Sequence, residues 1–265
     1  MSDMSYHRPA SVAEAARLAA GDADARILAG GQSILPSMRL GLLTPAALID
    51  LAAISELQGI RGDGRTLTIG AMTTHAAVAA SKEVLAKIPA LARLAHGIGD
   101  AQVRNRGTIG GSVANSDPAA DYPAAVLGLN ATLRTSARTI AADGFFTGLF
   151  ETALKPGELI VAIDFPLPAK AGYAKFPQPA SRFALVGVFV AQTANGVRVA
   201  VTGAGSHAFR VKALEDALSR SCTPQACEGI RIAADALNTD IHGNAEYRAH
   251  LIPVLAKRAV QNMLG

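Results

Sequence analysis

Two pairs of adjacent glycines, each next to residues with hydroxyl groups, constrain this chain more than any other feature. The first pair lies in Ala29-Gly30-Gly31-Gln32-Ser33, at the end of a short apolar stretch, and the second lies in Thr108-Ile109-Gly110-Gly111-Ser112. Paired glycines let backbone amides approach an anion without an intervening side chain, and hydroxyl groups add donors for phosphate oxygens. Two such loops in one domain suit a diphosphate, with each loop facing part of it.

A structural interpretation of these loops is equally simple, because a single Gly-Gly after a strand is more often a tight turn than a phosphate site. Neither loop matches the dinucleotide fingerprint G-x-G-x-x-G or the P-loop pattern G-x-x-x-x-G-K-[ST]. The residues by themselves therefore indicate candidate anion-binding loops in an α/β domain, and no specific ligand.

A carboxylate follows the second loop and has two interpretations. Asp121 lies just before an expected helix, where a cap for the helix N-terminus is the more common role. The functional alternative is a carboxylate that accepts hydrogen bonds from sugar or ribityl hydroxyls. Composition alone favours the cap.

The pattern of apolar residues predicts alternating helices and strands. Ser11-Val12-Ala13-Glu14 forms a capping box for a helix that Gly21 ends. The other expected helices span residues 74–80, 88–98, 122–129, 145–150, 210–219, 224–237 and 247–263. The expected strands span residues 26–29, 47–51, 57–60, 66–70, 130–134, 138–140, 158–165, 183–191 and 197–203.

Pro166-Leu167-Pro168 interrupts this pattern and predicts a domain boundary. Residues 1–168 would form the domain with the glycine loops, and residues 169–265 a smaller domain with a short antiparallel sheet and helices. The fold class is therefore α/β (α+β).

Composition narrows the function. The net charge of the 265 residues is +4, but no basic stripe gathers on one segment, so we expect no nucleic-acid binding. Cys222 and Cys227 are too few for an iron–sulfur cluster and are not spaced as zinc ligands, so we expect no metal on this chain. Neither a signal peptide nor an apolar run long enough to span a membrane is visible, which predicts a cytoplasmic protein.

Several segments together resemble the flavoprotein family of carbon monoxide dehydrogenase and xanthine dehydrogenase, the FAD-binding medium subunits of molybdenum hydroxylases. The stretch from Ile27 to Pro36 is similar to the first FAD loop of that family, and the stretch from Gln102 to Gly111 to its second loop. Residues 115–121 resemble the continuation, and residues 69–75 the segment between the loops. The resemblance implies a PCMH-type FAD-binding domain of two subdomains, followed by the family's C-terminal domain.

The resemblance also implies roles for individual residues. The loops would wrap the FAD pyrophosphate through amides and hydroxyls, Asp121 would hold ribityl or ribose hydroxyls, and Lys175 would face the flavin ring. Pro177 and Gln178 depart from the basic residues that many relatives have there. The residues expected to bind FAD are Ala29, Gly30, Gly31, Gln32, Ser33, Ile34, Ile98, Thr108, Ile109, Gly110, Gly111, Ser112, Asn115, Asp117, Asp121, Ile160 and Lys175.

The implied function is electron transfer inside a larger oxidoreductase. Electrons would arrive from [2Fe–2S] clusters on a small partner subunit, and the molybdenum cofactor would lie on a large one. FAD on this chain would pass them to an external acceptor, which is a quinone, another carrier or NAD. The resemblance also implies a dimer of heterotrimers, the usual assembly in this family.

Two alternatives stay open, a free-standing FAD oxidoreductase of similar fold and a non-enzymatic assembly module. We assign no side chain as a catalytic acid or base. His75 and His96 lie near the loops, and a lone histidine is most often a packed or capping residue.

Overall fold

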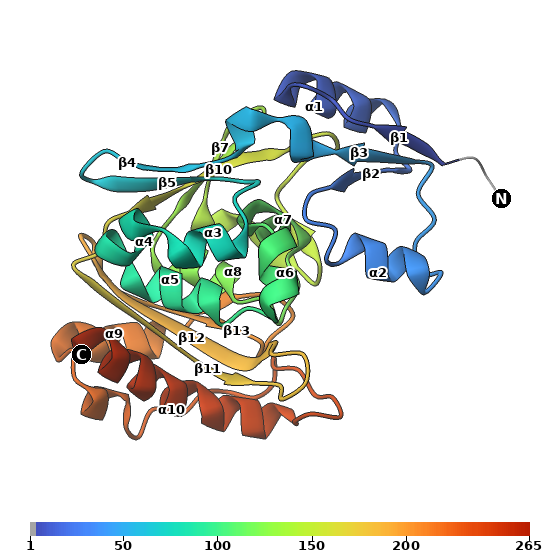
Figure 1. Ribbon diagram of the computed structural model, residues 1–265. Helices are drawn as coiled ribbons and strands as arrows, with labels where there is room; N and C mark the ends of the chain where they lie inside the picture. Colours follow the sequence, from blue (N-terminus) through green and yellow to red (C-terminus); the bar gives the residue numbers. More distant parts are fainter. Residues whose placement is uncertain (1–3) are drawn as a thin grey trace.

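The computed structural model describes residues 4–265 and arranges them as sheets with helices packed between and outside them (Figure 1). The mixed α/β class is confirmed, as is the antiparallel C-terminal sheet covered by helices. The core falls into three clusters of buried side chains, one in each of the parts described below.

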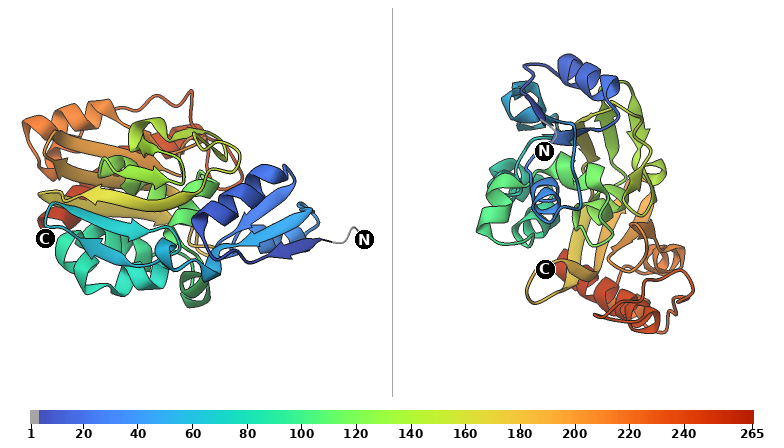
Figure 2. Two further views of the ribbon diagram at one scale, coloured as in Figure 1. Left: turned by 90° about the horizontal axis from the view of Figure 1, so that it is seen from above. Right: turned by 90° about the vertical axis from the view of Figure 1, so that its right-hand side faces the viewer.

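The N-terminal part is a small parallel sheet that projects to one side of the molecule (Figure 2). Its strands, in the order β1-β3-β2, are β1 (Ser5–His7), β2 (Ala25–Leu28) and β3 (Ala47–Asp50). Helix α1 (Val12–Gly21) covers it, and the Ser11 hydroxyl caps this helix by accepting the Glu14 amide at 3.2 Å, as the capping box predicts. Helix α2 (Ile34–Arg39) follows β2, and two short 3-10 helices, η1 (Leu51–Ala53) and η2 (Ser55–Leu57), lead out of the sheet.

The central part is an antiparallel five-stranded sheet with a layer of helices on one face. The strands, in the order β4-β5-β10-β6-β7, are β4 (Ile60–Gly62), β5 (Thr66–Gly70), β10 (Ile160–Pro166), β6 (Thr132–Thr135) and β7 (Thr139–Ala141). The expected hairpin is formed by β4 and β5, and Gly64 in its turn has a φ of +89°.

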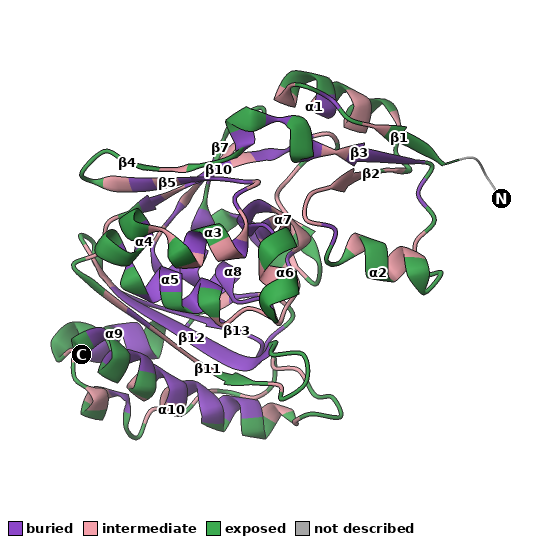
Figure 3. Cartoon of the chain, viewed as in Figure 1, coloured by how far each residue is buried: buried purple, intermediate pink, exposed green. Residues whose placement is uncertain are grey.

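The helices of this layer carry much of the largest cluster of buried side chains (Figure 3). They are α3 (His75–Ala80), α4 (Lys82–Lys87), α5 (Pro89–His96), α6 (Ala101–Arg106), α7 (Ile109–Asn115) and α8 (Tyr122–Gly128). A 3-10 helix, η3 (Ala142–Gly144), and a small two-stranded sheet, β8 (Phe146–Gly148) and β9 (Glu151–Thr152), precede β10.

The C-terminal part is an antiparallel four-stranded sheet, in the order β11-β12-β13-β14, lying between that helix layer and two further helices (Figure 1). Its elements are β11 (Lys170–Pro177), β12 (Ala184–Thr193), β13 (Gly196–Thr202), β14 (Phe209–Arg210), α9 (Lys212–Arg220), η4 (Pro224–Cys227) and α10 (Ala245–Leu264).

Strand β12 is buried on both faces because its side chains alternate between two cores. Val186, Val188 and Val190 join the cluster under α9 and α10, whereas Phe189 and Ala191 join the cluster of the central part. Alternate residues of a strand point to opposite faces, so one continuous apolar run serves two layers.

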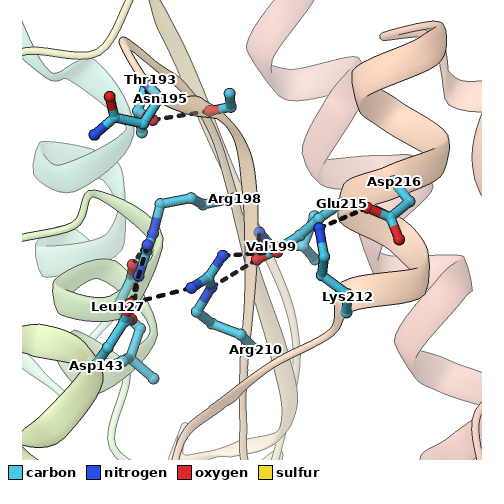
Figure 4. Close-up of polar contacts among 11 residues, drawn as sticks. Leu127, Asp143, Thr193, Asn195, Arg198, Val199, Arg210, Lys212, Glu215 and Asp216 are labelled. Carbon is cyan, nitrogen blue, oxygen red and sulfur yellow. Dashed lines mark hydrogen bonds and ion pairs between the residues drawn. The ribbon is translucent and has the colours of Figure 1, made fainter.

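Charged side chains also join the C-terminal sheet to the central part (Figure 4). The Arg198 guanidinium donates to the Leu127 carbonyl at 2.8 Å and pairs with Asp143. Arg210 contacts the same Asp143 carboxylate at 3.1 Å and also binds the buried Glu215 of α9. These bonds cross from one part to the other and fix how the sheet lies against the helices.

Two expected helices are absent, and five strands, β1, β8, β9, β11 and β14, were not predicted. Residues 145–150 form strand β8 instead, since Gly148 weakens a helix there and Phe150 adopts a positive φ of 54° that no helix contains. Residues 224–237 form only the turn η4 and then an irregular segment, in which Gly229 has a φ of +76°. Strands β1 and β11 carry no clear alternation of apolar and polar residues, and their neighbours in the sheets stabilise them.

Within residues 4–265, none of the helices combines the length and the apolar character that crossing a bilayer requires.

Candidate functional site

A cavity of about 550 Å³ is lined by the connection from β2 to α2 and by residues of α6 and α7. That volume is in the usual range for sites that bind small molecules and cofactors. The structure brings both glycine loops and Asp121 together in its wall. The predicted residues that line it are Ala29, Gly30, Gly31, Gln32, Ser33, Ile34, Ile98, Thr108, Gly111, Ser112, Asn115, Asp117 and Asp121.

The first loop, residues 29–33, presents unused backbone donors to the cavity. Gly31 adopts a φ of +75°, which turns the chain sharply between the end of β2 and the start of α2. Within residues 4–265, the amides of residues 30–33 donate no hydrogen bond to another residue. The loop therefore has donors available for an anion, together with the hydroxyl of Ser33.

The second loop, residues 108–112, has already used its amides. The Ile109 amide donates to the Thr73 carbonyl at 3.0 Å, and the Gly110 amide donates to the Ala71 carbonyl at 2.8 Å. The Gly111 amide donates to the Thr108 hydroxyl at 3.1 Å, which caps α7, and the Ser112 amide donates to the Thr108 carbonyl at 3.0 Å. The expectation that these four amides wrap a pyrophosphate is therefore corrected, because each has a partner inside the chain.

The two loops touch each other directly through a glycine. A Cβ on Gly30 would lie 2.2 Å from the Arg106 carbonyl oxygen and 2.7 Å from the Gly107 Cα. Only a residue without a side chain fits between these backbones. Residues 30 and 107, which we call the seam between the loops, both line the cavity.

Asp121 does not cap a helix, although it stands at the N-cap position of α8 and makes no side-chain cap bond there. Its carboxylate, 3% exposed, accepts the Tyr173 hydroxyl at 2.5 Å and contacts the Lys175 ammonium at 2.9 Å. Residues 173 and 175 are two apart on β11, so both side chains point to the same face of that strand. The carboxylate that faces the cavity is therefore held by the C-terminal sheet.

Burial is the main influence on the two carboxyl groups at this wall. Burial raises the pKa of the Asp121 carboxyl, while the Lys175 ammonium and the Tyr173 hydroxyl oppose that shift. Burial also raises the pKa of Asp117, whose carboxylate accepts the Ala119 amide at 2.9 Å. Two acceptor groups on one wall suit a ligand with several hydroxyls.

Four predicted residues lie outside the cavity lining. Ile109 and Ile160 are buried in the core of the central part, and Gly110 packs against Ala71. The Lys175 ammonium donates to the carbonyls of Gly97 at 2.9 Å and Arg182 at 2.8 Å in addition to contacting Asp121. Lys175 therefore does not line the cavity and instead stabilises the lining residues through these contacts.

Sequence reasoning missed several lining residues. His75 lines the cavity but was interpreted as a packed or capping residue. Ser181, Arg182 and Phe183 reach it from the C-terminal part, in a loop where Arg182 has a φ of 62°. No local pattern predicts this, and the resemblance of the C-terminal domain to the family, which covers residues 176–187 most closely, was the only available signal.

The residues present fit an FAD molecule. Unused amides and hydroxyls suit its pyrophosphate, and the Asp121 carboxylate suits its hydroxyls. Within residues 4–265, no group of three or more His, Cys, Asp or Glu side chains is arranged to hold a metal ion.

Fold and cavity together define a class, an α/β protein with a cavity between two glycine loops that suits a phosphate-bearing cofactor. The family model described as the FAD-binding domain in molybdopterin dehydrogenase matches residues 2–168. This chain belongs to that family.

Similar proteins extend the match to the whole chain. The carbon monoxide dehydrogenase medium chain of Hydrogenophaga pseudoflava is 37% identical over 96% of this chain and 95% of its own length. The nicotine 6-hydroxylase medium subunit of Paenarthrobacter nicotinovorans is also 37% identical, over 96% and 95%. The solved structure of reconstituted carbon monoxide dehydrogenase from Oligotropha carboxidovorans has a TM-score of 0.91 at 33% identity and covers 98% of this chain and 97% of that one.

These similarities confirm the resemblance drawn from the sequence, including the fold with an FAD-binding domain. The chain is an oxidoreductase subunit, the FAD-binding medium subunit of a complex of the molybdenum hydroxylase type. The molybdenum cofactor and the iron–sulfur clusters are carried by other subunits in such complexes.

Proposed function

We propose that this subunit is the electron exit of its complex. It takes electrons from [2Fe–2S] clusters on a small partner subunit and passes them to an external acceptor, which is a quinone, another carrier or NAD. The observation that carries the proposal is the cavity, in which free amides of one loop face a carboxylate held by the other domain.

FAD, when bound, supplies the electron-transfer chemistry, and the protein supplies its position and its electrostatic surroundings. The amides of residues 30–33 and the hydroxyls of Ser33 and Ser112 bind the pyrophosphate. The Asp121 carboxylate accepts hydrogen bonds from ribityl or ribose hydroxyls. Lys175 and Tyr173 hold that carboxylate in place and exclude water from its far side.

The other predicted contacts stay proposals. Gln32, Ile34, Ile98 and Asn115 line the same wall and pack against the cofactor. Ile109, Gly110 and Ile160 act through packing behind it.

The assembly and the domain limits are also proposals. We propose a dimer of heterotrimers, each with a large molybdenum subunit and a small iron–sulfur subunit. The boundary after residue 168 lies in the short segment between β10 and β11, which leaves 1–168 as the FAD-binding domain and 169–265 as the second domain. The cytoplasmic location expected from the sequence stays a prediction.

The test compares the complex containing the natural chain with one containing Asp121→Ala, each purified through a tag on this subunit. We expect FAD, identified by mass after denaturation, in the first complex and little in the second. Both complexes are then reduced with limiting dithionite and mixed with a quinone or NAD. Reoxidation of the clusters, followed by electron paramagnetic resonance, should slow at least about tenfold in the variant.

Equal reoxidation in a complex that lacks FAD would refute the exit role. Substrate oxidation by this chain without any partner would instead identify a free-standing oxidoreductase.

A further inference from the structure

His75 is a buried side chain at the cavity that the family resemblance does not explain. It is the first residue of α3, which the Thr74 hydroxyl caps by accepting the Ala77 amide at 3.2 Å. Its own amide donates to the Gly107 carbonyl at 2.9 Å. The residue is only 4% exposed, and yet it lines the cavity. Its place in the fold is thus fixed by the backbone at the seam between the two loops.

The two ring nitrogens of His75 have different surroundings. Nδ1 is fully buried and has no hydrogen-bond partner within residues 4–265. Nε2 lies beside Gly107, since a Cβ on that glycine would be 2.5 Å from it. The ring is also packed against Tyr122, with 5.3 Å between the ring centroids, so it has no room to turn. Nε2 is therefore the nitrogen on the side of the loop seam.

The proton of this imidazole belongs on Nε2. Burial, with a smaller contribution from Arg104, lowers the pKa of His75 to about 4, so the ring is neutral near pH 7 and carries one N–H. Buried N–H groups without an acceptor are rarer in proteins than acceptors without a donor. The orphaned Nδ1 is thus the unprotonated nitrogen, and Nε2 carries the proton, with no side-chain hydrogen bond contributing to the pKa of His75 within residues 4–265.

The cavity wall around His75 has few free hydrogen-bond donors for an anion. The amides of residues 109–112 are already bonded inside the chain, so that side of the cavity offers an anion few groups besides hydroxyls. A neutral N–H donor on His75 would lie in the lining of the same cavity as the free amides of residues 30–33. Buried polar groups without partners call for such an explanation.

We propose that His75 is a cofactor-binding residue whose neutral imidazole donates an Nε2–H hydrogen bond to the pyrophosphate of FAD. The inference rests on the proposed binding of FAD in this cavity. It gives α3 a direct contact with the cofactor. It also makes Gly107 the residue that leaves space for the ring.

The experiment measures ligand binding and does not depend on turnover. Full-length chain stripped of FAD is titrated with FAD and with ADP, which carries the same pyrophosphate. His75→Leu removes the donor, His75→Gln keeps a donor close to the Nε2 position, and His75→Asn places one nearer Nδ1. Tyr122→Phe is the matched control, because that hydroxyl is equally buried and unpartnered but does not line the cavity.

We expect His75→Leu to weaken FAD and ADP binding by about tenfold to a hundredfold, as for a lost hydrogen bond to a charged group. His75→Gln should recover most of the affinity, His75→Asn little, and Tyr122→Phe should bind like the natural chain. The ³¹P resonances of bound FAD should shift in the Leu and Asn variants and stay close to their natural positions in the Gln variant.

Equal affinities and unchanged ³¹P resonances in all four variants would overturn the role of His75 while leaving FAD binding intact. Should the Leu variant fail to fold, the contrast between Gln and Asn decides the same question. If the natural chain binds no FAD, even with its partner subunits, the proposed cofactor site itself fails and the role of His75 with it.

Discussion

The two glycine loops look alike in the sequence but differ in what their backbones do. The loop at residues 29–33 leaves the amides of residues 30–33 without a partner in the described part of the chain and leads from a small projecting sheet into α2. The loop at residues 108–112 donates the amides of residues 109–112 to the chain and begins α7, which packs against β10. The first loop thus offers its amides to a ligand, whereas the second loop is fixed by hydrogen bonds within the chain. Both loops nevertheless carry the same pair of glycines.

The glycines themselves show the same contrast. Gly31 is needed for a positive φ of +75°, whereas Gly110 is needed because a Cβ would lie 2.4 Å from the Cβ of Ala71. A glycine pair in a sequence can therefore indicate a turn that faces a ligand or a close approach of buried backbone. The neighbours in space decide between them.

The largest expected effect is the loss of stability on breaking the ion pair that holds Asp121, the carboxylate that follows the second loop. In Lys175→Met, the buried Asp121 carboxylate loses its counter-charge, and removing one partner of a buried ion pair costs about 3–5 kcal/mol of stability. Denaturant unfolding of the FAD-free chain measures this loss.

Lys212→Met is the control, since Lys212 forms an ion pair with Asp216 at 2.6 Å on an exposed helix face. That pair should contribute no more than about 0.5 kcal/mol. Similar losses in the two variants would contradict a special role for Lys175.

The next largest effect is the pH dependence of the stability that His75 contributes. The pKa of His75 is lowered to about 4 in the folded chain, from an ordinary value near 6.5 in the unfolded chain. The unfolded chain therefore binds a proton that the folded chain rejects, so this stability is complete above about pH 6.5 and is lost as the pH falls towards 4. We expect a loss of at most about 3 kcal/mol from this group.

Unfolding curves at several pH values should show the loss in the natural chain and a smaller one in His75→Gln. Parallel pH profiles for the two proteins would mean that the pKa of His75 is not lowered in the folded chain.

The smallest effect separates the two glycines. Gly110→Ala should destabilise the FAD-free chain by about 1–3 kcal/mol because its Cβ meets buried backbone, even though alanine favours a helix. Gly31→Ala should cost about 1 kcal/mol, since its nearest neighbour is the flexible end of Leu35 and the positive φ is the main penalty. The clearer effect of Gly31→Ala should be weaker FAD binding, in a chain that still folds.

Gly144→Ala, with no atom within 4 Å of the added Cβ, gives the baseline for both measurements. If Gly110→Ala keeps its stability and loses only FAD, the assigned difference between the loops is wrong.

Local signals predicted much of the fold. The capping box at Ser11 and the turn at residues 62–64 act through neighbouring residues alone, and both were placed correctly. The segment 224–237 has an amphipathic composition but ends its only helical turn at Cys227, because packing against α10 overrides its propensity. Strand β11 was missed for the opposite reason, since pairing with β12 stabilises a segment with little pattern of its own.

The site was predictable only in part. Resemblance placed both loops and Asp121, but composition favoured a cap for Asp121 because its true partners, Tyr173 and Lys175, lie more than 50 residues away. The free or bonded state of a backbone amide cannot be read from residue types at all. It depends on what packs nearby, as Thr73 and Ala71 do against the second loop.

Because Tyr173 and Lys175 hold Asp121 in place, the wall of the cavity that would bind the cofactor is completed only after β11 has been synthesised. A ribosome releases the loops and Asp121 first, and the carboxylate then waits without its counter-ion until β11 has been made and has joined its sheet. A chain truncated before residue 175 would keep every loop residue and still lack an ordered wall. Retained flavin would then act as a checkpoint, reporting that the last third of the polypeptide has been completed and folded.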